Sequence, residues 1–130
     1  MTRKELSQLY YIDKEIRALQ KRLAELRAGG VIQSPVLSGM PGGGPGDKVA
    51  SMATEIASLE QKIDAELTRR IAEERRLRAY IAGVDDALMR LILQYRHVEL
   101  LRWWQVAGRL GGGNTADSVK KIYQRFLARM

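Results

Sequence analysis

Leucine and isoleucine recur with a heptad period at the start of this chain, and this pattern restricts the fold more than any other feature. From Leu9 to Leu26 the steps are three, four, three, four and three residues, with charged residues between them. Such residues form one apolar stripe along an α-helix, which is stable only when a second helix covers it. We therefore predict a helix from Thr2 to Arg27, ended by Gly29-Gly30. The stripe consists of Leu9, Ile12, Ile16, Leu19, Leu23 and Leu26.

A second stripe with the same period follows later in the chain. It begins with Val49, Met52, Ile56, Leu59 and Ile63. At Leu67 and Ile71 the steps become four and four, which resembles a stutter that locally unwinds a supercoil. The pattern resumes at Leu77, Ile81, Val84, Leu88 and Leu91. The spacing predicts a second helix, longer than the first.

Residues 29–46 separate the two stripes and hold seven of the twelve glycines and all three prolines. This composition predicts a long loop without a regular element. Two amphipathic helices joined in this way fold back most simply as an antiparallel coiled-coil hairpin, here over residues 1–82. A parallel dimer of two extended helices is the alternative. We expect a homo-oligomer, dimeric or larger, in which the first stripe and Met52, Ile56, Leu59 and Ile63 are the oligomerisation residues.

Almost all of the net charge of +7 lies in the last third of the chain. Residues 90–130 contain eight Lys and Arg against two acids, whereas residues 1–89 contain fourteen against thirteen. A clustered basic segment is typical of proteins that bind nucleic acid. The eight are Arg90, Arg96, Arg102, Arg109, Lys120, Lys121, Arg125 and Arg129.

Three short helical patterns make up residues 84–130, which we predict to be a separate domain. Asp85-Asp86 can cap the first, whose apolar positions are Leu88, Leu91, Ile92 and Tyr95 and which ends near His97. The second buries Trp103, Val106, Ala107 and Leu110, leaves Trp104 more exposed, and stops at Gly111-Gly112-Gly113. The third starts at Asn114 or Thr115, with Asn114 and Asp117 approximating a capping box, and buries Val119, Ile122 and Phe126.

The second and third patterns are two helices joined by a glycine turn, and the later helix has an outward face of basic and amide side chains. This is the layout of a helix-turn-helix, whose second helix enters the major groove of DNA. Lys and Gln can donate to base edges and phosphates, and Asp117 can accept from cytosine. The outward face comprises Thr115, Ala116, Asp117, Lys120, Lys121, Gln124 and Arg125. Arg102, Arg109 and Arg125 are predicted to bind phosphates.

The C-terminal residues resemble a known family of DNA-binding domains. "DDALMRLILQYRHVELLRWWQVAGRLG" and "TADSVKKIYQRFLARM", residues 85–111 and 115–130, resemble the region-4 helix-turn-helix of bacterial sigma factors. With the loop "LSGMPGGGPGDKV", residues 37–49, the whole chain resembles the ArpU/RinA-type phage regulators of late transcription. The resemblance implies an activator of phage or prophage late genes that binds double-stranded DNA, with bacterial RNA polymerase as a candidate partner. It implies base contacts at Ala116, Asp117, Lys120, Lys121 and Gln124, and backbone contacts at Thr115 and Arg125.

One spacing departs from the family pattern. Ala107 and Val119 are twelve residues apart, against about ten in the usual helix-turn-helix, and the extra pair lies in Gly111–Asn114. The departure predicts a longer and softer turn before the third helix.

Other classes of function find less support in the sequence. The chain has no cysteine, which excludes disulfides, and no apolar run near the ~20 residues that cross a bilayer. Because residues 1–15 are polar and charged, we expect no signal peptide, and we expect no membrane partner. The absence of cysteine allows a cytosolic location, and the resemblance implies the cytoplasm of a bacterial host cell. His97 is the only histidine and lacks partners at a ligand spacing, so we expect no metal. The few Ser and Thr residues have no plausible His or Asp partner to activate them, so we expect no enzyme activity and no cofactor.

Two rival functions stay open. A small terminase-like DNA-packaging protein also combines a helix-turn-helix with coiled-coil oligomerisation, but we would expect its helix-turn-helix first in the chain. A coiled-coil adaptor that binds RNA polymerase or another protein would need no DNA contact, so substitution of Lys120 and Lys121 would leave its function intact.

Overall fold

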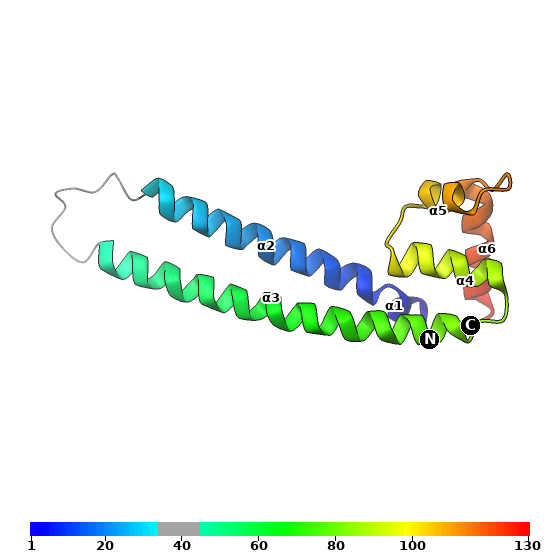
Figure 1. Ribbon diagram of the computed structural model, residues 1–130, viewed down its shortest axis with the longest axis horizontal. Coiled ribbons are helices and arrows are strands. Elements are labelled where there is room, and N and C mark those ends of the chain that lie inside the picture. The colour runs from blue at the N-terminus through cyan, green and yellow to red at the C-terminus, as the bar shows by residue number, and fades with distance from the viewer. Residues whose placement is uncertain (34–44) are drawn as a thin grey trace. The chain divides into compact units, whose positions relative to one another are not determined.

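The computed structural model describes residues 1–33 and 45–130, and places side chains for residues 1–29 and 48–130. The described residues are helical and contain no strand, which confirms the all-α class (Figure 1). The elements are α1 (Arg3–Leu6), α2 (Gln8–Gln33), α3 (Pro45–Ala82), α4 (Ala87–Leu93), the π-helix η1 (Gln94–Val98), α5 (Trp103–Leu110) and α6 (Ala116–Ala128).

Packing divides the chain into two units. Unit 1 comprises Met1–Ile12 and Arg70–Met130, and unit 2 comprises Asp13–Arg69. These ranges do not coincide with the predicted domains 1–82 and 84–130, because the first turns of the chain and the end of α3 pack with the C-terminal helices. Most of the predicted loop 29–46, residues 34–44, lies outside the described residues.

The predicted first helix begins where expected, with Thr2 as its cap, but it is interrupted at Ser7 and ends later than predicted. Ser7 separates α1 from α2. Its backbone N–H donates the regular helical bond to the Arg3 carbonyl at 3.1 Å, and its hydroxyl donates to the same carbonyl at 3.1 Å, a second bond that often bends a helix. The helix also continues through Gly29-Gly30 to Gln33. Glycine in a helix costs only about 1 kcal/mol, which neighbouring turns can offset. At the other side of the loop, α3 begins at Pro45, because proline needs no N–H partner in a first turn.

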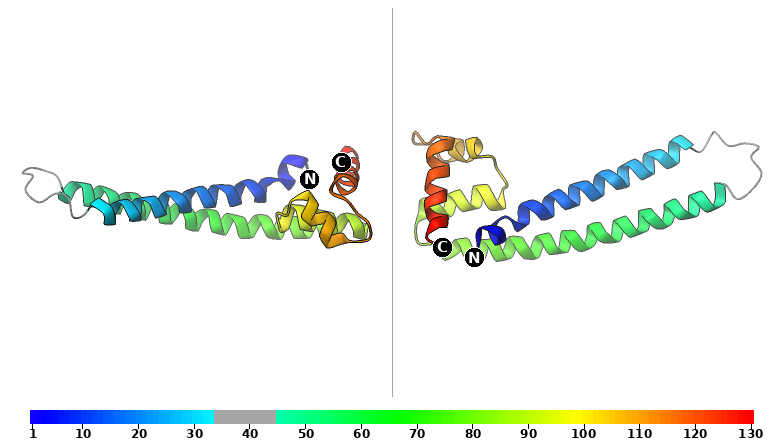
Figure 2. Two further views of the ribbon diagram at one scale, coloured as in Figure 1. Left: turned by 90° about the horizontal axis from the view of Figure 1, so that it is seen from above. Right: turned by 180° about the vertical axis from the view of Figure 1, so that it is seen from behind.

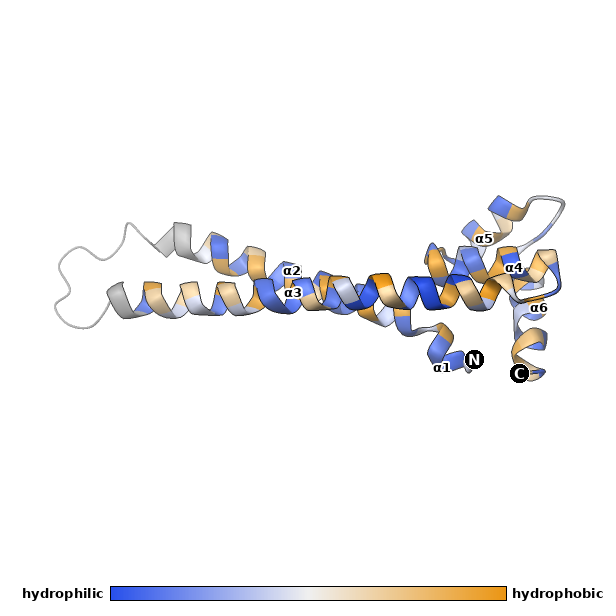
Figure 3. Ribbon diagram, turned by 60° about the horizontal axis from the view of Figure 1, so that its bottom comes forward, coloured by the Kyte–Doolittle hydropathy of each residue, from blue (hydrophilic) through white to orange (hydrophobic). Residues whose placement is uncertain are grey.

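Unit 2 contains parts of α2 and α3, which lie side by side (Figure 2). Hydrophobic and hydrophilic residues alternate along both helices (Figure 3). Leu23, Leu59 and Ile63 form its buried centre, with Leu19, Leu26 and Ile56 partly buried around it. Arg22 pairs with Glu55 at 3.1 Å and Arg27 with Glu60 at 2.6 Å. All four charged side chains are about half exposed, so these pairs add little stability and the apolar stripe supplies most of it.

The residues assigned to oligomerisation are largely covered within one chain. Six of the ten are buried: Leu9, Ile12, Ile16, Leu23, Leu59 and Ile63. Leu19, Leu26, Met52 and Ile56 are half-buried. The six buried side chains are unavailable to another copy of the chain while this packing lasts, and the role of all ten residues in a homo-oligomer stays a prediction.

Unit 1 has its own core, and residues from the start of the chain form part of it. Leu6 has no exposed surface and Leu9 is 2% exposed. They share one hydrophobic cluster with residues of every later helix: Leu77, Ile81, Met89, Ile92, Leu93, Val98, Val106, Ala107, Val119 and Tyr123. The C-terminal helices therefore do not bury their apolar faces only against one another.

The predicted apolar face of α4 is right at Leu88, Ile92 and Tyr95, which pack in the core, and wrong at Leu91. Leu91 is 41% exposed, whereas Met89 and Leu93 are buried beside Ile92. The segment Leu88–Leu93 is apolar at five of six positions, so its periodicity is too weak to fix which side faces inward. The following π-helix adds one residue to a turn and brings both His97 and Val98 into the core.

Candidate nucleic-acid interface

The net positive charge of the protein lies entirely in unit 1. By sequence, unit 1 has fourteen Lys and Arg against seven Asp and Glu, and unit 2 has eight against eight. Unit 1 therefore carries a net +7 and unit 2 a net zero. A polyanion would be attracted to one packing unit and not to the other.

The turn between α5 and α6 requires glycine and is held by specific hydrogen bonds. Gly111, Gly112 and Gly113 have φ of 65°, 63° and 80°. Gly111 combines this φ with ψ of −154°, a region that is essentially restricted to glycine. Its N–H donates to the Ala107 carbonyl at 3.0 Å, and its carbonyl accepts from the Asn114 side chain at 2.6 Å. The turn is longer than usual, as predicted, but it is bonded at both ends.

The cap of α6 is Thr115, and the predicted capping box of Asn114 and Asp117 is wrong. Thr115 Oγ1 accepts from the Ser118 N–H at 3.1 Å, and Ser118 Oγ accepts from the Thr115 N–H at 2.9 Å. Asn114 is instead used to close the turn onto Gly111. The reciprocal pair fixes the first residue of α6, because it satisfies backbone donors that the helix leaves free.

The inward face of α6 was predicted only in part. Val119 is fully buried, whereas Ile122 and Phe126 are partly buried. Tyr123 is the second buried residue of the helix, and it was missed. Its hydroxyl lies 2.8 Å from His97 Nε2, and its ring centroid lies 4.9 Å from that of Trp103. These contacts set the rotation of α6, and with it the residues that face outward.

His97 links α6 to the start of the chain. Its ring bonds both Tyr123 and the Leu6 backbone. Burial, and to a smaller extent the nearby Arg96 charge, lower the pKa of His97 from 6.5 to about 4, against the opposing effect of the Leu6 bond. The imidazole is therefore neutral at pH 7, so Nε2 can accept from the Tyr123 hydroxyl. Burial also raises the pKa of Tyr123, which keeps that hydroxyl protonated.

Half of the eight basic residues in the last third of the chain are engaged within the fold. Arg90 donates to the Val84 and Asp85 carbonyls, at 2.5 and 2.9 Å. Arg96 donates to the Leu101 carbonyl at 3.0 Å and stacks over Trp103, 4.6 Å from the ring centroid. Arg109 pairs with Glu99 at 3.3 Å and Lys121 with Asp117 at 3.1 Å. The last two pairs are exposed, so each is weak and can be exchanged for a phosphate.

The other four basic residues are exposed and form no ion pair with the described side chains: Arg102, Lys120, Arg125 and Arg129. Lys120 and Arg125 flank exposed Gln124 on α6, and Arg102 precedes the first residue of α5. Arg129 follows α6 and is exposed in the same way, but it is not among the predicted contacts.

The remaining candidates differ in exposure. Asp117 is exposed but paired, Thr115 is exposed but serves as the cap, and Ala116 is only half-exposed. Trp104 is 65% exposed and Trp103 lies partly in the core, which confirms the predicted difference between them.

Among residues 1–33 and 45–130, no cluster of three or more His, Cys, Asp or Glu side chains could hold a metal ion. None of the helices in this part of the chain has the length and apolarity to cross a membrane.

Comparison of the chain with protein-family profiles, with curated proteins and with solved structures finds no match.

Proposed function

We propose that this protein is a sequence-specific DNA-binding transcriptional regulator, with α5, the glycine turn and α6 acting as a helix-turn-helix. The observation that carries this proposal is the concentration of unpaired cations on one helix and its neighbours, within the unit that holds all of the net charge. The resemblance of the sequence to phage late-gene regulators favours an activator of late genes, with RNA polymerase as a candidate partner.

In this proposal α6 lies in the major groove. Gln124 can bond both the N6 and N7 positions of an adenine, and Lys120 can donate to the O6 and N7 acceptors of a guanine. Arg102 and Arg125 lie at the edges of this face and would bind phosphates, which position the helix without reading sequence. Lys121 can leave its exposed pair with Asp117 and join them at a cost of a few tenths of a kcal/mol.

The buried contacts beneath α6 support the same assignment. A helix that reads base edges must hold its orientation closely, because each base contact depends on side-chain direction. Tyr123 is held by the His97 nitrogen on one side and by the Trp103 ring on another. The Thr115–Ser118 cap then fixes where the helix begins.

The direct test is to sequence the genomic DNA fragments that the purified protein retains at ~50 and ~200 mM salt, the range over which phosphate-driven affinity falls steeply. The proposal predicts a few sites that persist at the higher salt. Uniform retention that disappears with salt would contradict base readout and leave only a nonspecific clamp.

A pair of matched variants separates the interface from general charge. Lys120→Ala with Lys121→Ala removes two charges from α6, and Lys21→Ala with Lys62→Ala removes two from the exposed surface of unit 2. We expect the first to abolish binding to the retained sites and the second to leave it unchanged. Equal loss in both would mean that net charge alone drives binding, and no loss in either would favour the adaptor.

Homo-oligomerisation is part of the proposal, because two copies would place two α6 helices on two half-sites and multiply a weak single-site affinity. Sedimentation of the protein distinguishes the regulator from its packaging rival. We expect a small oligomer such as a dimer, whereas a ring of many subunits would favour a terminase-like protein.

A further inference from the structure

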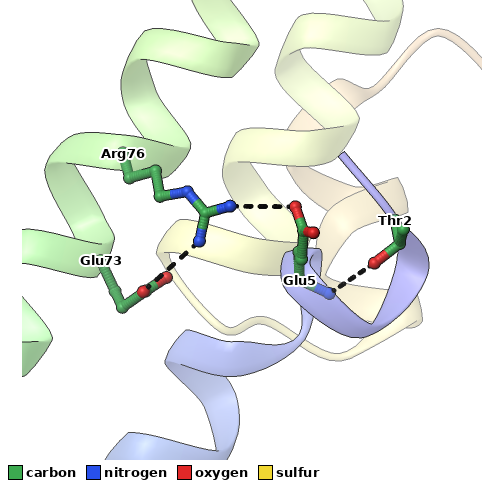
Figure 4. Close-up of polar contacts among 4 residues, drawn as sticks. All are labelled: Thr2, Glu5, Glu73 and Arg76. Carbon is green, nitrogen blue, oxygen red and sulfur yellow. Dashed lines mark hydrogen bonds and ion pairs between the residues drawn. The ribbon is translucent and has the colours of Figure 1, made fainter.

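The first helix of the chain is attached to unit 1 in three independent ways. Leu6 packs in its hydrophobic core, in one cluster with Leu9 at the start of α2. The Leu6 backbone bonds the His97 ring, which itself bonds Tyr123 of α6. Arg76 of α3 donates to Glu5 at 3.0 Å (Figure 4). The position of α1 beside the other helices of unit 1 is therefore determined by apolar, polar and ionic contacts together.

The ion pair engages the negative charge of residues 1–12. Glu5 is the only acid among residues 1–12, and it is paired with Arg76, which also contacts Glu73 at 3.7 Å. Thr2 caps the helix by accepting the Glu5 N–H at 3.2 Å (Figure 4). Arg3 and Lys4 lie between these two residues, are exposed, and pair with no acid in the part of the chain that the structure describes. The segment thus presents two uncompensated cations.

α1 packs with α6 in the core of unit 1, where Leu6 shares one hydrophobic cluster with Val119 and Tyr123. In agreement with this packing, the Arg3 charge lowers the pKa of Tyr123, against the larger effect of burial. A helix in the major groove is flanked by two phosphate ridges, about 12 Å apart. Cations on an element adjacent to such a helix therefore meet phosphates and not base edges.

We infer that α1 is a second DNA-contacting element, in which Arg3 and Lys4 bind backbone phosphates beside the groove that α6 enters. This inference rests on the proposed DNA binding. It extends the interface from the C-terminal helices to the first residues of the chain, which the core of unit 1 brings beside them.

Arg3→Gln with Lys4→Gln tests the inference, and Lys21→Gln with Lys62→Gln is the matched control with the same net charge. Both are measured on the full chain by fluorescence anisotropy with a mixed-sequence duplex of about 30 base pairs, roughly three helical turns. Each lost phosphate contact lowers the slope of log affinity against log salt by about 0.9. Between ~50 and ~200 mM salt, the first variant should lose about tenfold less affinity than the wild type, and the control should follow the wild type.

A measurement on the unaltered protein avoids any effect of the substitutions on folding. Lysine acetylation with and without the duplex, read by mass spectrometry, should show protection of Lys4 and Lys120 but not of Lys21 and Lys62. Protection of Lys120 with full reactivity of Lys4, and an unchanged salt slope in the Arg3 and Lys4 variant, would overturn the inference and leave the proposed function standing. Loss of protection at both positions would overturn the two together.

Discussion

Leu6→Ala tests whether the first turns of the chain belong to the C-terminal unit. Leu6 has no exposed surface and lies in one cluster with residues of α3, α4, α5 and α6. Truncation of a fully buried leucine removes its transfer free energy and leaves a cavity, which together cost about 2–5 kcal/mol. Leu6 also carries the backbone group that bonds His97, so a shift of α1 into the cavity would disturb that bond. We expect a loss toward the upper half of this range.

Urea unfolding followed by tryptophan fluorescence measures the free energy of unfolding of unit 1, because both tryptophans, Trp103 and Trp104, lie in that unit. Leu91→Ala is the matched control: it is the same chemical change in the same unit, at a side chain that is 41% exposed. We expect it to cost about 1 kcal/mol or less, because truncation of a partly exposed leucine removes less buried surface and leaves no enclosed cavity. Equal losses in the two variants, or a loss below about 0.5 kcal/mol for Leu6→Ala, would refute the placement of α1 in this core.

Two further predictions use the same fluorescence assay. The first concerns pH: the folded pKa of His97 is about 4 and its ordinary value is 6.5, so the unfolded chain binds the proton first as the pH falls. The free energy of unfolding of unit 1 should be at its full value above pH 6.5 and should fall by roughly 3 kcal/mol between pH 6.5 and 4. The variant His97→Gln should flatten this pH dependence. An unchanged pH dependence in that variant would mean that other groups cause it. The second concerns the turn: Gly111→Ala should cost about 1–3 kcal/mol because of its backbone angles, although no atom lies within 4 Å of the added Cβ. Gly108 lies within α5 and has equally open space around an added Cβ, so Gly108→Ala should stabilise the protein by about 0.5–1 kcal/mol. A loss of stability in both variants would show that steric contact of the added methyl group, and not the backbone angle φ, causes the cost.

The features that the sequence predicted correctly are those that depend on near neighbours. Asp86 caps α4, the three glycines end α5, and Trp103 packs inward while Trp104 faces solvent. Each follows from the chemistry of a few adjacent residues: a carboxylate that accepts a free N–H, a backbone that tolerates positive φ, and a helical step of 100°. The capping box was placed one residue too early, because Asn114 and Thr115 can both accept such a bond and only the turn geometry distinguishes them.

The features that were missed depend on contacts between distant segments. Tyr123 and His97 are 26 residues apart, and neither stands out in a periodic pattern, since tyrosine and histidine occur on surfaces and in cores alike. The break at Ser7 interrupts an otherwise regular stripe, so periodicity alone continues the helix through it. The exposed Leu91 shows the same limit, because a nearly continuous apolar run fits either phase until its neighbours are known.

Charge counted along the sequence and charge available to a ligand are different quantities, and the proposed DNA interface depends on the second. Arg90 and Arg96 lie in the most basic part of the chain, yet each binds backbone carbonyls of its own unit. With four unpaired cations near α6, the slope of log affinity against log salt should be about −4 per chain, and Arg3 and Lys4 should bring it to about −5. A much steeper slope for a single chain would require Arg109 and Lys121 to leave their acidic partners. Because those pairs are exposed and weak, their release is the next available source of phosphate contacts, before any residue that supports the fold is disturbed.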